Sequence, residues 1–511
     1  MQNGTLLAAI DLGSNSFRLE IGRLEHNQIQ RTEYLKETVR QGNGLDADRN
    51  LTQEAMQRGW DCLARFAERL AGFKKSQVRA VATQTLREAR NRDIFLLQAH
   101  KILGFPIDVI SGREEARLIY QGVAHFLPLS IDQRRLVVDI GGRSTEMIIG
   151  CGLQAHTMES YRLGSVAWSM RYFPDGDFTR RAFASAEIAA LAVLDDATVL
   201  YRPDTWDTAY GSSGTIGAVC DVLAMAGGNR WTKGIVTKEG LDWLLNHLME
   251  AQNARNLRLE GMKDDRRAVI GGGLSVLRAV FKLLNIEQME AAQGALRHGV
   301  LFDMLDREQA ETDVRVVTVQ RLAQKFTTDL IQGRRVSQVA QHLFNMVNPE
   351  LVASDKERFL RKLDWAGTLH EIGTCISHSE HHKHGAYILD NADAPGFAQP
   401  ELHRLSQLVL GHKGKLRKLE ANFEDTLLMQ QLLCLRLAVI LCHARIEPNL
   451  KGLLLNCNTL PANQWTNQAI GTFVLQCRQS WGTNFPQSMH LLQEESIAWQ
   501  KTPWIFEIVE I

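Results

Sequence analysis

Two short segments combine aspartate, glycine and serine in a way that suits phosphate chemistry. They are DLGSNSFRLEIG at 11–22 and DIGGRSTEMIIG at 139–150. Each begins with an aspartate at the end of an apolar run, and a turn of small residues follows. Such a turn lets successive backbone N–H groups point at one anion, because no Cβ blocks the approach. The aspartate is placed to hold Mg²⁺, which takes few carboxylates and keeps several waters.

The two segments predict an internal repeat in which a strand, a tight turn and a second strand are used twice. Five positions match: Asp11/Asp139, Gly13/Gly141, Ser16/Ser144, Ile21/Ile149 and Gly22/Gly150. A third turn, YGSSGTIGA at 210–218, follows a strand-like run and opens a helix. All three could be hairpins that bind nothing. Their shared context favours phosphate binding instead.

A helix is predicted to begin at SGREEARLIY. Ser111 and Glu114 have the spacing of a capping box, which gives Glu114 a structural role. Glu115 is rotated by about 100° around the helix and does not share that role. It is either a solvated first-turn acid or a base that deprotonates an attacking water, and the residues leave both interpretations open.

The segment TQTLREA predicts a second capping box, from Thr85 and Glu88. Arg87 then lies in the first helical turn, where a cation opposes the helix dipole. This placement favours a functional role, since a guanidinium can bind two phosphate oxygens at once. The alternative is a simple ion pair with Glu88 or Asp93.

Composition restricts the class of protein. The 511 residues exceed what a single core usually supports, so three or four domains are expected. Lys+Arg and Asp+Glu both number 58, so bulk charge gives no reason to expect nucleic acid or membrane binding. No stretch approaches 18 uninterrupted apolar residues, so no integral membrane segment is expected. The eight cysteines form no C-x-x-C pair, which favours a reducing compartment. The N-terminus is not typical of a signal peptide, and a cytoplasmic location is predicted.

Patterning changes along the chain. Strand-like and helical runs alternate to about residue 310, as in α/β proteins. Helical patterns dominate from about 311 to about 445, and short strand-like runs such as GTFVLQC and WIFEIVEI follow 451. The predicted order is therefore a two-lobed α/β part, a helical domain and a small mixed α/β tail.

The motifs, taken together, resemble one family. They are DLGSNSFRL, TQTLREA, ISGREEARLIYQGV, VVDIGGRSTEMIIG, GSSGTIGA and QGALRHGVL. In this order they look like the exopolyphosphatase / guanosine pentaphosphate phosphohydrolase (Ppx/GppA) family, and the layout is similar to its long bacterial exopolyphosphatases. The resemblance implies actin-like (ribonuclease H-like) ATPase lobes at 1–125 and 126–310. It further implies a helical HD-like domain at 311–450, a small C-terminal domain at 451–511 and a homodimer, cytoplasmic or peripheral at the inner membrane.

The resemblance also implies roles for individual residues. Glu115 would be the catalytic base, with Arg87 neutralising a phosphoryl oxygen. Asp139, Glu146 and Asp11 would lie at a Mg²⁺ site. The phosphate-binding residues would be Gly13, Ser14, Asn15, Ser16, Gly141, Gly142, Ser144, Thr145, Gly211, Ser213 and Gly214.

The expected activity is Mg²⁺-dependent hydrolysis of the terminal phosphate of inorganic polyphosphate. The first alternative is the same reaction on guanosine pentaphosphate, because the cleft motifs do not separate these substrates. An actin-like kinase or chaperone relative is a second alternative, although Glu115 would have no obvious role in it. A non-catalytic polyphosphate or nucleotide sensor is a third.

Three features depart from the simplest picture. Arg143 stands where the family usually has a third glycine, so it is either strained, if φ is positive there, or a cation that points into the cleft. The histidine-rich segment 369–389 resembles an HD site, but His370 is followed by Glu371. A packing scaffold is therefore expected rather than a binuclear metal site. The basic run HKGKLRK at 412–418 is a solvated face or a path for a polyanion.

Overall fold

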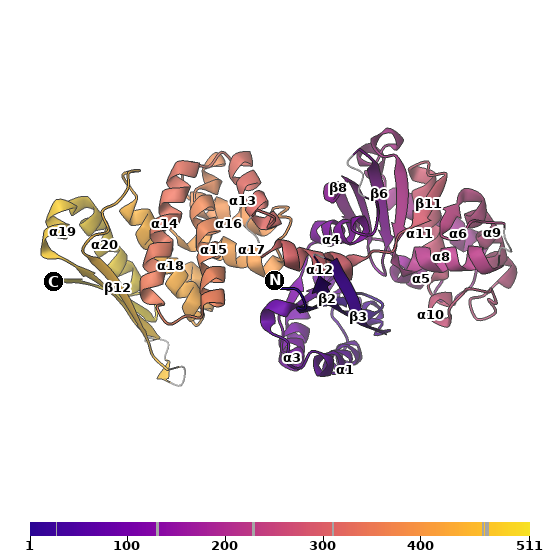
Figure 1. Ribbon diagram of the computed structural model, residues 1–511, viewed down its shortest axis with the longest axis horizontal. Helices are drawn as coiled ribbons and strands as arrows, with labels where there is room; N and C mark the ends of the chain where they lie inside the picture. The colour runs from indigo at the N-terminus through magenta and orange to yellow at the C-terminus, as the bar shows by residue number, and fades with distance from the viewer. Residues whose placement is uncertain (27, 129–131, 227–229, 309–310, 462–463, 466–469) are drawn as a thin grey trace. The chain divides into compact units, whose positions relative to one another are not determined.

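The computed structural model describes residues 1–511 except 27, 129–131, 227–229, 309–310, 462–463 and 466–469 (Figure 1). The chain divides into two compact units, Met1–Asp313 and Val314–Ile511. Across the described residues, no helix is both long and apolar enough to span a membrane. Each unit is described separately below.

Unit 1 contains two mixed sheets. The first has five strands in the order β3-β2-β1-β4-β5, and the second has six in the order β10-β11-β9-β6-β7-β8. The strands of the first are β1 (Leu6–Leu12), β2 (Phe17–Glu25), β3 (Gln28–Glu37), β4 (Val78–Ala82) and β5 (Ile107–Val109). Those of the second are β6 (Arg134–Ile140), β7 (Thr145–Cys151), β8 (Gln154–Tyr161), β9 (Thr208–Ser212), β10 (Ile235–Thr237) and β11 (Gln288–Ala291).

The predicted repeat is confirmed in the strand pairing. β1 and β2 are antiparallel and their last pair is Leu12 with Phe17, which leaves 13–16 as the turn. β6 and β7 are antiparallel and end on Ile140 with Thr145, which leaves 141–144 as the turn. Both sheets therefore place a four-residue turn at the end of a buried strand.

Helices cover the outer face of each sheet and two helices lie between the sheets. The helices of unit 1 are α1 (Gln53–Arg69), α2 (Gln84–Glu88), α3 (Arg92–Leu103), α4 (Gly112–Ala124), α5 (Ser165–Tyr172), α6 (Arg180–Val193), α7 (Ala197–Leu200), α8 (Ser213–Ala226), α9 (Lys238–Ala251), α10 (Asp264–Arg267), α11 (Ile270–Leu283) and α12 (Leu296–Asp306). Alternate residues of β1 explain the layers, because Ala8 and Ile10 pack with α1 and α3 whereas Leu7 and Ala9 pack with α4 and α12.

α4 and α12 join the two lobes. Their shared core includes Val81 of the first sheet and Ile148 of the second, and Figure 1 shows both helices beside the two sheets. They pack at backbone distance, since a Cβ at Gly299 would lie 1.8 Å from the Leu118 carbonyl oxygen. A Cβ at Gly122 would lie 2.2 Å from the Ala295 carbonyl oxygen. Larger side chains at these glycines would force the helices apart.

A buried charge network fixes the same helices. Asp303 of α12 accepts hydrogen bonds from Arg79 of β4, from Arg117 of α4 at 2.5 Å and from Arg307 at 2.6 Å. Arg117 also bonds both oxygens of Glu114, each at 2.8 Å. Although burial opposes ionisation, the three arginines hold the pKa of Asp303 below its usual value.

Unit 2 is helical and ends in a small sheet. Its helices are α13 (Val314–Lys325), α14 (Leu330–Val347), α15 (Ala353–Leu369), α16 (His381–Asn391), α17 (Gln399–Gly411), α18 (Thr426–Leu441), α19 (Gln479–Asn484) and α20 (Pro486–Trp499). The strands are β12 (Leu453–Thr459), β13 (Gly471–Cys477) and β14 (Trp504–Glu510), in that spatial order. One hydrophobic core runs from the helices into the sheet, where Phe473 stacks on Trp504 with ring centroids 4.9 Å apart.

Candidate functional site

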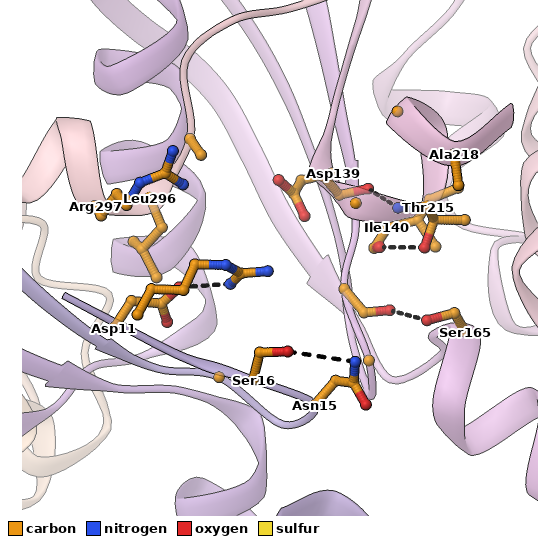
Figure 2. A pocket seen from close by; sticks show the side chains of 18 of the residues that line it. Asp11, Asn15, Ser16, Asp139, Ile140, Ser165, Thr215, Ala218, Leu296 and Arg297 are labelled. Carbon is orange, nitrogen blue, oxygen red and sulfur yellow. Dashed lines mark hydrogen bonds and ion pairs between the residues drawn. The ribbon is translucent and has the colours of Figure 1, made fainter. Parts of the chain in front are cut away.

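The turns after β1 and β6 face a cavity of about 450 Å³ within unit 1 (Figure 2). Most of the residues predicted from the sequence line it: Asp11, Gly13, Ser14, Asn15, Ser16, Glu115, Asp139, Gly141, Gly142, Ser144, Ser213 and Gly214. Four predicted residues lie outside this lining: Arg87, Thr145, Glu146 and Gly211. The structure therefore brings residues separated by more than a hundred positions into one wall.

The two repeated turns lie against each other. A Cβ at Gly142 would be 3.1 Å from the Ser14 Cβ and 3.5 Å from the Asn15 nitrogen. A Cβ at Gly13 would be 2.9 Å from the Ser16 carbonyl oxygen. Neither glycine has a positive φ, so close approach rather than a left-handed backbone explains the glycine at both positions.

The third turn carries backbone strain. Ser213, the first residue of α8, has φ 98°, a region that non-glycine residues rarely adopt. Its Oγ accepts a hydrogen bond from the Thr215 nitrogen at 3.2 Å, which ties down the start of the helix. Strained serines of this kind gather at functional sites, and this one lines the cavity.

Thr145 and Gly211 have packing explanations. The Thr145 hydroxyl donates to the Leu163 carbonyl oxygen at 2.8 Å, in a fully buried position. A Cβ at Gly211 would lie 2.7 Å from the side chains of Ile216 and Met289. Direct phosphate contact by these two residues stays a prediction.

Asp11 and Asp139 occupy opposite sides of the cavity (Figure 2). Asp11 ends β1 and accepts a hydrogen bond from Arg18 at 2.9 Å, across the hairpin. Asp139 ends β6, and burial raises its pKa to about 6, with the charge of Asp11 adding to the rise and Ser212 and Arg18 opposing it. Two carboxylates in one buried space favour a cation between them.

Glu115 lies in the first turn of α4 and lines the cavity. Ser111 caps this helix as predicted, by accepting from the Glu114 nitrogen at 3.1 Å. Burial raises the pKa of Glu115, and Arg87 opposes this because its Nη1 donates to Glu115 Oε2 at 2.7 Å. The carboxylate is thus oriented by an arginine and faces open space, which a general base requires.

Glu146 lies behind Glu115 and is fully buried. Burial raises its pKa well above the usual value, and the charges of Glu115 and Asp139 raise it further. It accepts a hydrogen bond from Ser160 at 2.7 Å. These surroundings favour the protonated acid, and its predicted role at a metal site stays a prediction.

The predicted capping box at Thr85 and Glu88 is wrong. Helix α2 begins at Gln84 with Thr83 at its N-cap, and the buried Thr85 hydroxyl has no hydrogen-bond partner among the residues that the structure describes. Arg87 is also placed differently than expected, since it donates to Gln84 Oε1, the Ile110 carbonyl oxygen and Glu115. Its guanidinium acts on the carboxylate of Glu115 rather than facing the cavity.

Both expectations for Arg143 are wrong. Its φ is not positive, so the turn tolerates arginine without backbone strain. Its side chain leaves the second lobe and reaches the first, where Nη2 lies 3.0 Å from Glu88 Oε2 and Nη1 donates to the Gly42 carbonyl oxygen at 3.0 Å. Glu88 accepts from Gln84 at 2.7 Å. A continuous series of contacts therefore runs from Arg143 through Glu88, Gln84 and Arg87 to Glu115.

The donor set of the cavity fits a magnesium ion. Asp11 and Asp139 supply hard oxygen ligands, and a cation between them would stabilise the ionised form of Asp139, whose pKa burial raises. Within the described part of the chain, no group of three or more His, Cys, Asp or Glu side chains is arranged to hold a metal ion. Mg²⁺ suits such a site, because waters and substrate oxygens complete its coordination.

Three histidines of the histidine-rich segment, His370, His381 and His382, form a buried cluster with His412. The rings of His370 and His381 each lie 5.4 Å from that of His412, and His382 lies 6.3 Å from it. Nδ1 of His370 and of His412 each lies 2.6 Å from a backbone carbonyl oxygen, so each Nδ1 donates. Burial lowers the pKa of all four imidazoles and favours their neutral forms. The relation to HD hydrolases stays a prediction.

Several cavity residues were missed by the sequence analysis. They are Arg18, Tyr34, Lys36, Lys263, Arg266 and Arg297. Only Arg18 had a readable signal, because a four-residue turn at 13–16 places it directly opposite Asp11 in the hairpin. Tyr34 and Lys36 come from the edge strand β3, and Lys263 directly precedes α10. Arg266 and Arg297 lie in α10 and α12, where no sequence pattern points to the cavity.

Family models match most of the chain. The model of the Ppx/GppA phosphatase family matches residues 21–308, and that of Ppx/GppA phosphatase domain III matches residues 314–496. A protein of Vibrio atlanticus (strain LGP32) named guanosine-5′-triphosphate,3′-diphosphate pyrophosphatase is 40% identical over 451 residues, 87% of this chain and 89% of that protein. The protein of the same name from Pseudoalteromonas translucida (strain TAC 125) is 38% identical over 500 residues, 97% of each chain.

Solved structures agree with the fold of unit 1. An exopolyphosphatase-like protein has a TM-score of 0.53 and 26% identity, covering 59% of this chain and 98% of that chain. An exopolyphosphatase from Cytophaga hutchinsonii ATCC 33406 has a TM-score of 0.52 and 24% identity with the same coverage, which bears on the fold alone. The predicted α/β part followed by a helical region is thereby confirmed.

Proposed function

Because the chain belongs to the Ppx/GppA phosphatase family, we propose that it removes the terminal phosphoryl group of guanosine 5′-triphosphate 3′-diphosphate (guanosine pentaphosphate). Relatives that share 38–40% of their residues with this chain, over most of their length, carry the name of that activity. They support the nucleotide over inorganic polyphosphate, which the sequence alone had favoured. Hydrolysis of a phosphoanhydride is common to both substrates.

One observation carries the catalytic part of the proposal: Glu115 faces the cavity while Arg87 holds its carboxylate at 2.7 Å. Burial alone would protonate this acid, and the arginine favours the ionised form that can accept a proton. Glu115 then orients a water for in-line attack on the terminal phosphorus and takes its proton. The backbone N–H groups of the turns at 13–16 and 141–144 bind the phosphoryl oxygens and stabilise the charge that develops on them.

Asp11 and Asp139 would hold Mg²⁺ between them, from opposite sides of the cavity. When bound, the ion would neutralise charge on the phosphate chain. Arg18 keeps the Asp11 carboxylate in place through its 2.9 Å hydrogen bond. Burial and the charges of Glu115 and Asp139 raise the pKa of Glu146, which favours a neutral carboxyl and so less negative charge near an incoming polyanion.

Inorganic polyphosphate is the second candidate substrate. The 26% identical solved relative is described as exopolyphosphatase-like, and the turns and Glu115 would serve either substrate. In unit 2, Lys415 and Arg417 of the basic run line a separate cavity of about 1370 Å³. A homodimer and a cytoplasmic or peripheral location remain expectations from the resemblance.

The experiment is phosphate release by the full chain with Mg²⁺, with guanosine pentaphosphate and long-chain polyphosphate compared at equal concentrations of terminal phosphate. Faster turnover of the nucleotide supports the proposal. Faster turnover of polyphosphate reverses the order of the two candidates and leaves the catalytic residues unchanged. Release from neither substrate contradicts both and would favour a binding protein without catalysis.

A further inference from the structure

One cation of the cavity, Arg266, has no carboxylate that pairs with it alone. Arg266 of α10 lines the cavity with a side chain that is 11% exposed. In the described part of the chain its guanidinium makes no hydrogen bond, and its nearest carboxylate oxygen is Asp265 Oδ2, 4.0 Å away. Asp265 itself already pairs with Lys36 at 3.0 Å. A guanidinium has five donors, and burying them without partners costs free energy.

The guanidinium lies against the third turn. A Cβ at Gly214 would lie 2.1 Å from Nη2 of Arg266 and 2.6 Å from its Cζ. Glycine at this position leaves the room that the guanidinium occupies over the first turn of α8, beside the strained Ser213. Arg266 is therefore held at the wall that also carries the third turn.

The other cations of the cavity have acidic partners. Arg18 bonds Asp11, Arg297 pairs with Glu20, and Lys263 lies 3.8 Å from Asp221. Arg266 and Lys36 share one acid, Asp265. One positive charge of the lining is therefore left without a carboxylate, beside Lys36 and Lys263. This surplus favours an anionic ligand.

The surplus lies away from the proposed reaction centre. Strand pairing places Arg18 of β2 between Asp11 of β1 and Lys36 of β3, and Lys36 pairs with Asp265, the neighbour of Arg266. Arg266 interacts with Asp265, Arg18 and Tyr34, and burial among them lowers its pKa. The cavity therefore runs from the carboxylates past Arg18 to Tyr34 and Arg266. A ligand with two anionic groups could place one at each end.

We propose that Arg266, together with Lys36 and Lys263, forms a second anion subsite. It binds a diphosphate group that is attached to the nucleoside at a different position from the triphosphate that is hydrolysed. This inference rests on the proposed function and names its determinant, since guanosine pentaphosphate carries such a group at the 3′ position whereas GTP and linear polyphosphate do not. Hydrogen bonds from a guanidinium to phosphate are charge-assisted and strong, so this subsite would separate the three substrates.

The test is the steady-state kinetics of Arg266→Ala on guanosine pentaphosphate, GTP and tripolyphosphate. We expect kcat/KM for the pentaphosphate to fall by about 10- to 100-fold, mainly through KM, and the other two values to change by less than about threefold. Equal losses on all three substrates would overturn the proposal, because Arg266 would then act on the shared phosphates or on the fold. An unchanged value for the pentaphosphate would overturn it as well.

Two controls keep the test decisive. Arg267→Ala removes the neighbouring arginine of the same helix, which pairs with Asp264 at 2.9 Å and lies outside the cavity lining, so substrate preference should not change. Arg266→Lys keeps the positive charge. It should retain part of the preference for guanosine pentaphosphate if that preference depends on the charge and not only on the packing of the side chain.

A binding measurement separates this inference from the proposed function. Calorimetry compares guanosine 5′-diphosphate 3′-diphosphate with GDP, on the native chain and on Arg266→Ala. A preference for the first ligand that disappears in the variant supports the subsite even if the pentaphosphate is not hydrolysed. Equal affinity of the native chain for both ligands contradicts the subsite whatever the hydrolysis rates are.

Discussion

The acidic group in unit 1 and the histidine cluster in unit 2 both gather buried ionisable side chains, but they have opposite characters. Asp11, Glu115 and Asp139 line an open cavity, and arginines stand beside two of them. In the histidine cluster, the Nδ1–H groups of His370 and His412 donate to backbone carbonyl oxygens, and burial favours neutral rings. The difference teaches that residue types alone do not identify a site. Charge that remains unneutralised beside open space does.

The contrast between a catalytic acidic group and a structural histidine cluster fails if Glu115 is not needed for hydrolysis. Glu115→Gln removes the proton acceptor and keeps the shape of the side chain, so kcat should fall by about 10²- to 10⁴-fold while substrate binding persists. Phosphate release and calorimetry with the product nucleotide measure the two effects. Hydrolysis at the native rate would remove the carboxylate from the mechanism. His381→Asn, in the other cluster, is the matched control and should leave kcat unchanged.

A second test concerns the metal proposed for the acidic group. Asp139→Asn deletes one oxygen ligand and its charge, so the Mg²⁺ concentration for half-maximal activity should rise by about 10-fold or more. Chelation of Mg²⁺ should abolish phosphate release by the native chain. A Mg²⁺ dependence that is the same in the variant and the native chain would place the ion elsewhere.

The histidine cluster predicts a pH-dependent stability instead of an activity. Burial lowers the pKa of His382 to about 4, below the usual 6.5, so as pH falls the unfolded chain binds a proton before the folded chain does. The stabilising contribution is complete above pH 6.5 and is lost between pH 6.5 and about 4, at up to about 1.4 kcal/mol per pH unit for each proton. Urea unfolding as a function of pH measures the slope, and His382→Gln should reduce it by about one proton. An equal slope in both chains would contradict the neutral buried imidazole.

The smallest expected effect is that of Arg143, which joins the lobes beside the acidic group. Arg143→Gly removes the pair with Glu88, whose members are 20% and 16% exposed, so kcat should fall only about two- to fivefold. Because Arg143 acts through Glu88, the double variant with Glu88→Gln should lose no more than the single variants. Additive losses would show that the two residues act separately.

Sequence patterns predicted the parts of the molecule whose structure is set by residues close together in the chain. The repeated hairpins were readable because apolar strands and Gly/Ser turns fix them within twelve residues. Glu115 was placed correctly at the start of α4 because Ser111 sets the helix start. Pairs formed between distant segments could not be read, and Arg143 is an example, since its partners Glu88 and Gly42 come from the other lobe.

Arg266 illustrates the same limit more strongly. It comes from a four-residue helix in the run KDDRR, which in sequence is typical of a solvated face. In the cavity its guanidinium lies against Gly214, and no single-sequence pattern connects the two positions. The burial of His370, His381 and His382 agrees with a packing role, whereas the predicted degenerate HD scaffold stays a prediction.

The buried network around Asp303 bears on how the chain is made. A ribosome releases Arg79 and Arg117 long before their shared partner, since Asp303 lies 224 residues after the first and 186 after the second. Until α12 emerges, a nascent first lobe would bury two arginines with Glu114 and Asp108 nearby but without the carboxylate that both of them share. We therefore expect the final packing of this segment to follow the arrival of α12, whose residues complete the shared core.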